Sequence, residues 1–142
     1  MIVNYLLDTC VVSELAKTRP VQSVVDWVVS QDASRCFISS ITLGEIQKGV
    51  SKLADTPKKA ELQAWLDHDV RERFVGKIIA IAANEVLQWG RMQAALEQQG
   101  RPMPLMDSLI AATALFHDMT LVTRNTRDVE ASGVKLLNPW GM

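Results

Sequence analysis

The sequence predicts an α/β fold in which helices cover a central, mostly parallel sheet. Two observations carry this prediction: short apolar runs recur along the chain, and amphipathic helical patterns separate them. Strands that alternate with helices are typical of βαβ units, in which the sheet is covered on both faces. No internal repeat or linker interrupts the 142 residues, so residues 1–142 are expected to form one domain.

The first half of the chain already shows this alternation. In order, we expect a strand over Ile2–Leu7, a helix over Val11–Ala16, a break at Lys17–Pro20, a helix over Val21–Ser30, a strand over Arg35–Ser39 and a helix over Thr42–Leu53. The first strand is apolar almost throughout, as strands buried on both faces are. The second helix follows from the helical spacing of Val24, Val25, Val28 and Val29.

The second half continues the pattern. After a polar break at Asp55–Pro57, we expect helices over Lys58–Arg71, Ala82–Gln99 and Leu105–His117, and strands over Lys77–Ile81, Thr120–Thr123 and Gly133–Leu137. Gly100 follows the longest helical pattern and is a usual stop signal after a helix. The loop "GRPMP" then separates this helix from the next one.

Composition limits the classes of function. Hydrophobic residues make up 48% of the chain and charged residues 22%, as in ordinary folded proteins. Fifteen Lys and Arg against 16 Asp and Glu give a net charge of −1, so strong non-specific binding to nucleic acid is not expected. Any contact with nucleic acid would have to come from a local basic rim.

Cysteine usage and the N-terminus point to a cytoplasmic protein. Cys10 and Cys36 lie in apolar contexts without zinc-binding spacing, which favours reduced, buried thiols, although a disulfide between them is an alternative. No signal peptide is expected, and no apolar run approaches the roughly 20 residues that a membrane span needs. We therefore expect no membrane partner.

Acidic side chains follow the predicted strands. Asp8 ends the first apolar run, Glu45 lies a few residues after the second strand, and Asp107 lies in the first turn of a helix. Asn125 and Asp128 follow the strand that ends at Thr123. Ligands of open parallel sheets bind outside the carboxyl ends of the strands, so these side chains are candidates for one site.

A cluster of carboxylates would need a cation. Like charges a few ångströms apart repel each other, so some protonate or a cation neutralises them. Oxygen ligands without His or Cys suit Mg²⁺ or Mn²⁺ rather than zinc. The main chemistry of such a site is phosphoryl transfer.

Each acid also has an ordinary structural explanation. Asp8 is a good N-cap for the helix that follows it. Thr42 and Glu45 fit the spacing of a capping box. Asp107 favours the positive end of its helix, and Asp128 on its own is an ordinary loop acid. The residues alone therefore give only a candidate acidic metal site.

Four stretches of the chain resemble one family. They are "LLDTCVVSEL", "FISSITLGEIQKGV", "GRPMPLMDSLIAATALFHDMTLVTRNTRDV" and "LLNPW", which together span nearly the whole chain. In this order they are similar to the PIN-domain proteins of the VapC toxin group, and most closely to the FitB-like branch. The resemblance implies a PIN-like three-layer α/β/α fold with an acidic pocket at the strand ends.

The resemblance also implies an activity and partners. It implies a Mg²⁺- or Mn²⁺-dependent endoribonuclease with one or two ions, the toxin of a type II toxin–antitoxin pair. The implied partners are RNA as substrate, a VapB-like antitoxin and a second copy of the chain in a homodimer. Contact with DNA is expected only through the antitoxin.

By position, the resemblance assigns roles to the acids. Asp8, Glu45 and Asp107 match the three principal acidic residues, with Asp8 and Asp107 as direct metal ligands. Glu45 is expected to bind metal, hold a metal-bound water or act as base. Asn125 and Asp128 compete for the fourth position.

Hydroxyl and basic side chains complete the predicted site. Thr9 and Thr123 are expected to orient the carboxylates, with Ser39 as a further candidate. The residues expected to contact RNA phosphates are Lys17, Arg19, Lys48, Arg124 and Arg127, although basic residues are also common on solvated faces. Two positions depart from the family: Cys10 stands where Asn is frequent, and Val129 stands where Phe is common.

Other classes of function are weaker. A phosphatase of the haloacid dehalogenase type needs a second Asp two residues after the first, where this chain has Cys10. No GxGxxG or GxxxxGK[ST] loop supports nucleotide binding by a small-ligand α/β protein. A non-catalytic RNA-binding or regulatory PIN domain is the alternative to a nuclease.

Overall fold

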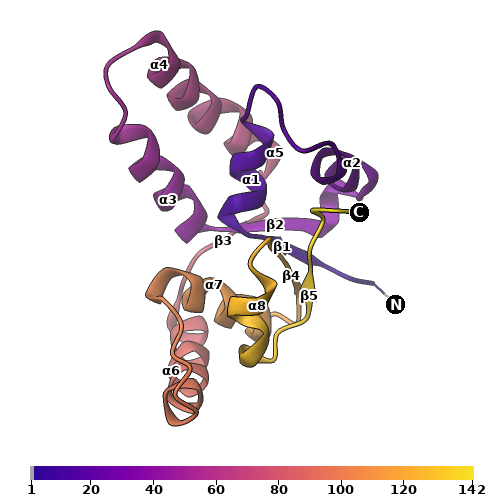
Figure 1. The fold of residues 1–142 in the computed structure, drawn as a ribbon, viewed down its shortest axis with the longest axis vertical. Coiled ribbons are helices and arrows are strands. Elements are labelled where there is room, and N and C mark those ends of the chain that lie inside the picture. Colours follow the sequence, from indigo (N-terminus) through magenta and orange to yellow (C-terminus); the bar gives the residue numbers. More distant parts are fainter. Residues whose placement is uncertain (1) are drawn as a thin grey trace.

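A parallel sheet forms the centre of the protein in the computed structural model, which describes residues 2–142 (Figure 1). Its five strands are β1 (Tyr5–Leu7), β2 (Cys36–Ser39), β3 (Ile78–Ile79), β4 (Thr120–Val122) and β5 (Leu136–Leu137). They lie in the order β3-β2-β1-β4-β5, and every neighbouring pair is parallel. The predicted α/β class and parallel sheet are therefore confirmed.

Helices cover both faces of this sheet, which gives three layers (Figure 1). The upper layer in the figure contains α1 (Thr9–Leu15), α2 (Gln22–Ser30), α3 (Ser40–Ser51), α4 (Pro57–Ala64) and α5 (Arg71–Arg73). The lower layer contains α6 (Ala83–Gln98), α7 (Leu105–Phe116) and α8 (Thr126–Val129). Short turns η1 (Ala33–Arg35) and η3 (Glu130–Ser132) precede β2 and β5.

Each face of the sheet has its own hydrophobic core, because successive strand residues point to opposite faces. Leu7 and Val122 pack in the upper core, with α1, α2 and α3. Leu6 and Leu121 pack in the lower core, with α6 and α7. All four side chains are buried, which explains why the strands read as continuous apolar runs.

Two helices begin earlier than predicted because a polar side chain caps each of them. The Asp8 side chain accepts a hydrogen bond from the Thr9 N–H at 2.8 Å, so α1 begins at Thr9. The Ser39 hydroxyl accepts one from the Ile41 N–H at 3.0 Å, so α3 begins at Ser40. The explanation of Thr42 and Glu45 as a capping box is therefore wrong, since both residues lie inside α3.

Three further elements differ from the prediction. The expected helix over residues 58–71 divides into α4, a π-helical turn η2 (Trp65–Val70) and α5. The first strand is shorter than expected, since Ile2 and Val3 are exposed and only residues 5–7 pair. The short helix α8 was not predicted, because its four residues are too few for a helical period.

The structure also bears on the state of the two cysteines and on the search for a membrane-spanning helix. Cys10 and Cys36 are both free thiols, as the reduced state predicts, and Cys36 is buried. Among residues 2–142, none of the helices combines the length and the apolar character needed to cross a membrane.

Candidate active site

The site lies where β1, β2 and β4 end. Asp8 follows β1 directly, Thr123 follows β4 directly, and α3 with Glu45 follows β2. The Asp8 N–H donates to the Val122 carbonyl oxygen at 2.9 Å, which fixes the exits of β1 and β4 side by side. These carboxyl ends meet at one edge of the sheet, as parallel strands require.

The Asp8 carboxylate is held at both oxygens. Oδ1 accepts from the Thr9 N–H, and Oδ2 accepts from the Thr123 hydroxyl at 2.7 Å. The Cys10 thiol lies 3.7 Å from the same Oδ2. The N-cap explanation is thus confirmed, and it does not conflict with a role in a site, because carboxylate oxygens carry further lone pairs.

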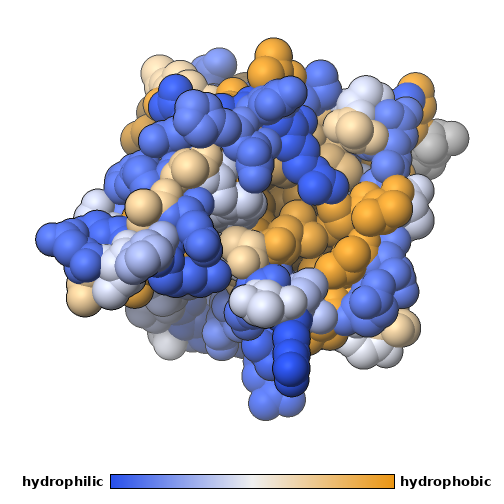
Figure 2. Space-filling view, turned by 90° about the horizontal axis from the view of Figure 1, so that it is seen from above, coloured by the Kyte–Doolittle hydropathy of each residue, from blue (hydrophilic) through white to orange (hydrophobic). Residues whose placement is uncertain are grey.

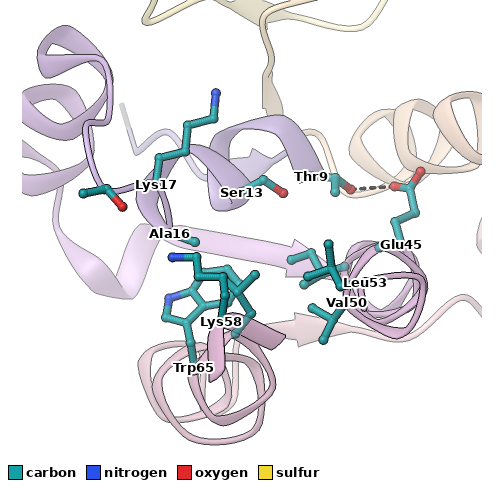
Figure 3. A pocket seen from close by; sticks show the side chains of 13 residues that line it. Thr9, Ser13, Ala16, Lys17, Glu45, Val50, Leu53, Lys58 and Trp65 are labelled. Atoms are coloured by element: carbon teal, nitrogen blue, oxygen red, sulfur yellow. Dashed lines mark hydrogen bonds between the residues drawn. The ribbon is translucent and has the colours of Figure 1, made fainter. Parts of the chain in front are cut away.

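The Glu45 carboxylate is held by a hydroxyl pair. Thr9 Oγ1 donates to Glu45 Oε1 at 2.5 Å, and Figure 3 shows this contact between α1 and α3. Thr42 Oγ1 lies 3.0 Å from Thr9 Oγ1. The backbone of Thr9 thus contacts Asp8 while its side chain contacts Glu45, so one residue connects two carboxylates.

Asp107 occupies the first turn of α7, as predicted, and is half-buried. Burial raises the pKa of the Asp107 carboxyl, and the negative charges of Asp8, Glu45 and Asp128 raise it further. A carboxyl is influenced in this way only by charges that are near it. The structure therefore brings Asp107 near the other three acids, which come from different parts of the chain.

The donor set fits a hard divalent cation in its chemistry. Carboxylate oxygens are the ligands that Mg²⁺ and Mn²⁺ prefer. As the side chains are placed, no three His, Cys, Asp or Glu residues within residues 2–142 lie close enough together to hold one ion. Repulsion between four like charges favours such a spacing.

The remaining predicted polar residues have different positions. Thr123 is fully buried, donates to Asp8 and accepts the Asn125 N–H at 3.1 Å. Asn125 itself stands directly before α8, and its side chain does not cap that helix. Ser39 caps α3, and its recorded hydrogen bond goes to the backbone rather than to an acid.

Cys10 lies in a more polar position than its sequence context predicts. The side chain is half-buried, and its sulfur accepts the Arg124 N–H at 3.5 Å. Burial raises the pKa of this thiol, and the Asp8 charge raises it further, so the thiol keeps its proton and can donate it to Asp8. Cys10 is therefore reduced, as expected, but only partly buried: it packs against the upper core while its sulfur contacts Asp8.

The five predicted basic residues are all exposed, namely Lys17, Arg19, Lys48, Arg124 and Arg127. The Arg124 guanidinium lies 5.6 Å from the centre of the Trp140 ring, so it contacts the C-terminal segment. Lys17 pairs with Glu14 at 2.9 Å. These two contacts place cations beside α1, the helix that Asp8 caps.

Sequence reasoning missed Glu14, a buried acid on α1. Its side chain is only 3% exposed and accepts the Lys17 ammonium and the Val21 N–H, each at 2.9 Å. These hydrogen bonds lower the pKa of the Glu14 carboxyl. The spacing of Glu14 and Lys17 was the only signal in the sequence, and such pairs are common on exposed helices.

A groove of about 500 Å³ extends from the site between α1, α3 and α4 (Figure 3). Thr9 and Glu45 lie at one end, and Lys17 and Lys58 also line it. Its apolar lining comes from Ala16, Ile46, Val50, Leu53, Leu62 and Trp65. The face seen from above in Figure 2 has hydrophobic side chains in a hollow with a hydrophilic rim.

Comparisons with known proteins agree with this geometry. Residues 5–132 match the PIN domain family. The chain is 32% identical to Toxin FitB of Neisseria gonorrhoeae over 135 residues, covering 95% of this chain and 97% of that protein. It is 29% identical to VapC ribonuclease Y4jK of Sinorhizobium fredii over 135 residues, covering 95% and 96%.

A solved structure shows the same fold. The crystal structure of FitAcB from Neisseria gonorrhoeae has a TM-score of 0.92 and 31% sequence identity, and the match covers 97% of this chain and 99% of that one. The order of strands, the placement of acids at the strand exits and these matches lead to one conclusion. The chain belongs to the PIN domain family.

Proposed function

We propose that this protein is a Mg²⁺- or Mn²⁺-dependent endoribonuclease and the toxin of a type II toxin–antitoxin pair. The observation that carries the proposal is the joining of Asp8 and Glu45 through Thr9 where β1 and β2 end, with Asp107 at the start of α7 under the influence of their charges. Two similar proteins, named as a VapC ribonuclease and as a toxin, support the same function.

The acids of the site supply the oxygen ligands that this proposed metal prefers. Asp8 and Asp107 would hold the ion directly, and Glu45 would bind it or a water beside it. When bound, one or two such ions polarise a phosphate and lower the pKa of a bound water. We assign the fourth position to Asp128 rather than Asn125, because the charge of Asp128 acts on Asp107.

The other side chains prepare the site for phosphodiester hydrolysis. Thr123 and the Thr9 N–H fix the Asp8 carboxylate, and the Thr9 hydroxyl fixes Glu45 through Oε1. Glu45 Oε2 then stands as the acceptor for a proton from the attacking water. A base held in this way needs no reorientation when the water attacks, which lowers the barrier.

RNA is expected to enter as a single strand. Bases in loops leave the backbone accessible, so a scissile phosphate can reach the strand exits. Exposed cations would bind the neighbouring phosphates, and the candidates are Lys17, Arg19, Lys48, Arg124 and Arg127. With a net charge of −1, binding depends on this local rim rather than on the whole surface.

An antitoxin partner fits the groove between α1, α3 and α4. Its apolar side chains would cover the apolar lining, and a basic group would reach Glu45 at the end of the groove. Opposite charge is the physical basis of such inhibition. We also propose a cytoplasmic homodimer that meets DNA only through the antitoxin.

One experiment tests the proposal. The protein is purified free of antitoxin, beside Asp8→Ala and the control Asp26→Ala, which removes an exposed carboxylate on α2. Each is incubated with total RNA in Mg²⁺, Mn²⁺ or EDTA, and the cleaved ends are mapped by sequencing. We expect discrete cuts from the wild type and Asp26→Ala, and none from Asp8→Ala or in EDTA.

Two other results would reject the proposal. Cleavage that persists in EDTA or in Asp8→Ala would show that the carboxylate site is not the catalyst. A folded wild type that binds RNA, holds no metal and cuts nothing would instead support a non-catalytic RNA-binding PIN domain.

A further inference from the structure

Thr42 lies inside α3 rather than at a strand exit, yet its hydroxyl contacts Thr9 of the acidic site. Its side chain is completely buried inside α3. A buried threonine in a helix often donates to the carbonyl one turn earlier, as Thr113 does to the Leu109 oxygen at 2.8 Å. Within residues 2–142, the hydrogen bond recorded for the Thr42 hydroxyl is instead with Thr9 on α1, at 3.0 Å.

The protons of this contact have only one consistent arrangement. A hydroxyl has one proton to donate, and an ionised carboxylate has none. Thr9 therefore donates its proton to Glu45, and Thr42 donates to Thr9. Hydrogen bonds arranged in such a chain strengthen one another, particularly in buried surroundings.

We propose that Thr42 is a positioning residue that fixes the Glu45 carboxylate relative to Asp8 by holding the Thr9 side chain. Thr9 bonds Asp8 through its backbone and Glu45 through its hydroxyl, so its rotamer sets how the two carboxylates stand. The hydrogen bond from Thr42 selects that rotamer. The consequence for RNA cleavage rests on the proposed function, whereas the geometry does not.

Loss of the Thr42 hydroxyl removes this selection. The Thr9 side chain can then turn between staggered rotamers, and its bond to Glu45 is no longer favoured over the others. Groups that orient a metal or catalytic ligand typically change activity by about 10–100-fold. We expect a loss of this size in kcat, with little change in KM for RNA, because Thr42 does not reach the surface.

Three variants test the inference. Thr42→Val keeps the shape and removes the hydroxyl, Thr42→Ser keeps the hydroxyl, and Thr113→Val removes an equally buried hydroxyl outside the site. We expect a loss of at least about tenfold in kcat for Thr42→Val only, with thermal midpoints close to wild type. If Thr42→Val folds poorly, Thr42→Ala makes the same test with less bulk.

A kinetic result and a structural result would each overturn the inference about Thr42. Wild-type kcat in Thr42→Val, or an equal loss in Thr42→Ser or Thr113→Val, would reject a positioning role for the hydroxyl. Crystal structures of metal-free wild type and Thr42→Val give a second readout without activity. We expect Glu45 to leave Thr9 in the variant, and an unchanged Glu45 would overturn the inference even if the wild type cleaves no RNA.

Discussion

The two halves of the acidic site hold their carboxylates in different ways. Asp8 and Glu45, beside α1 and α3, accept hydrogen bonds from the Thr9 backbone, Thr123 and the Thr9 hydroxyl. Asp107 and Asp128, on α7 and α8, accept no side-chain hydrogen bond within the described residues 2–142. Only the first pair is thus fixed by the protein itself.

The difference is what the proposed cation site requires, namely carboxylates that are oriented but keep their charge. Hydroxyl and backbone donors orient a carboxylate without cancelling its charge, whereas a Lys or Arg partner would compete with the cation. The unbonded pair keeps its full repulsion, which burial of Asp107 increases. Asp8 and Glu45 therefore form a fixed half, whose carboxylates are held in place by hydrogen bonds. Asp107 and Asp128 form a free half, which supplies negative charge.

The largest expected effect is the loss of cleavage when an acid from either half is removed. Asp8→Asn and Asp107→Asn should each lower the cleavage rate by more than about 100-fold, since groups that only orient such ligands account for 10–100-fold. RNA cleavage assays and circular dichroism of both variants measure rate and folding together. A variant that loses cleavage only because it unfolds would show that its carboxylate has a structural role alone.

Glu14 provides a control for the fixed half, because it is a buried acid on α1 whose partners do include a cation. Glu14→Gln should lower the free energy of unfolding by about 1–3 kcal/mol at pH 7, the usual loss for a hydrogen-bonded charged group. The pKa of Glu14 is lowered in the folded state, so this stability is present above the unfolded pKa and is lost as pH falls through the folded pKa. Urea titrations of the two proteins should therefore converge at low pH, and a constant difference would contradict the ion pair.

Removing the Asp107 charge should change stability in the opposite direction to removing the Glu14 charge. Its raised pKa means that the folded state binds this proton more tightly than the unfolded state, so its charge opposes folding above the folded pKa. Asp107→Asn should therefore raise the thermal midpoint of the metal-free protein at pH 7. The gain should shrink as pH falls through the raised pKa, and scanning calorimetry in EDTA at several pH values measures it.

Added metal should reverse the order of the thermal midpoints of the wild type and Asp107→Asn. A saturating cation that binds the folded wild type stabilises it and binds the variant less. A lower midpoint for Asp107→Asn in EDTA would show that the free half carries no repulsion.

The smallest effect is expected at Cys10, whose thiol is an additional donor to Asp8. Cys10→Ser should change the cleavage rate by less than about tenfold, since the serine hydroxyl keeps a donor to Asp8 and a typical hydrogen bond contributes only ~0.5–1.5 kcal/mol. Cys10→Asn, which introduces the residue frequent at this position in the resembling family, makes the same comparison. Losses as large as those of Asp8→Asn would show that the thiol, rather than Thr123, fixes the carboxylate.

Much of the fold could be predicted from local patterns. Apolar runs such as residues 5–7 and 120–122 and the long helical period of residues 83–98 identify their elements, because burial on both faces or on one stripe imposes a period. Local patterns failed where few residues decide the outcome. Ser39 rather than Thr42 caps α3, and a π-helical turn at residues 65–70 interrupts the helix expected over residues 58–71.

By itself, the sequence determined the class of the fold and the places of the four acids at strand exits or helix starts, and the family resemblance added the chemistry to expect. Only the tertiary structure decided that these acids act on one another, that Thr42 contacts Thr9 and that Cys10 contacts Asp8. The physical reason is the range of the interactions. Periodicity and capping depend on neighbours within one turn, whereas the contact from Thr123 to Asp8 joins residues 115 positions apart, which only a folded sheet brings together.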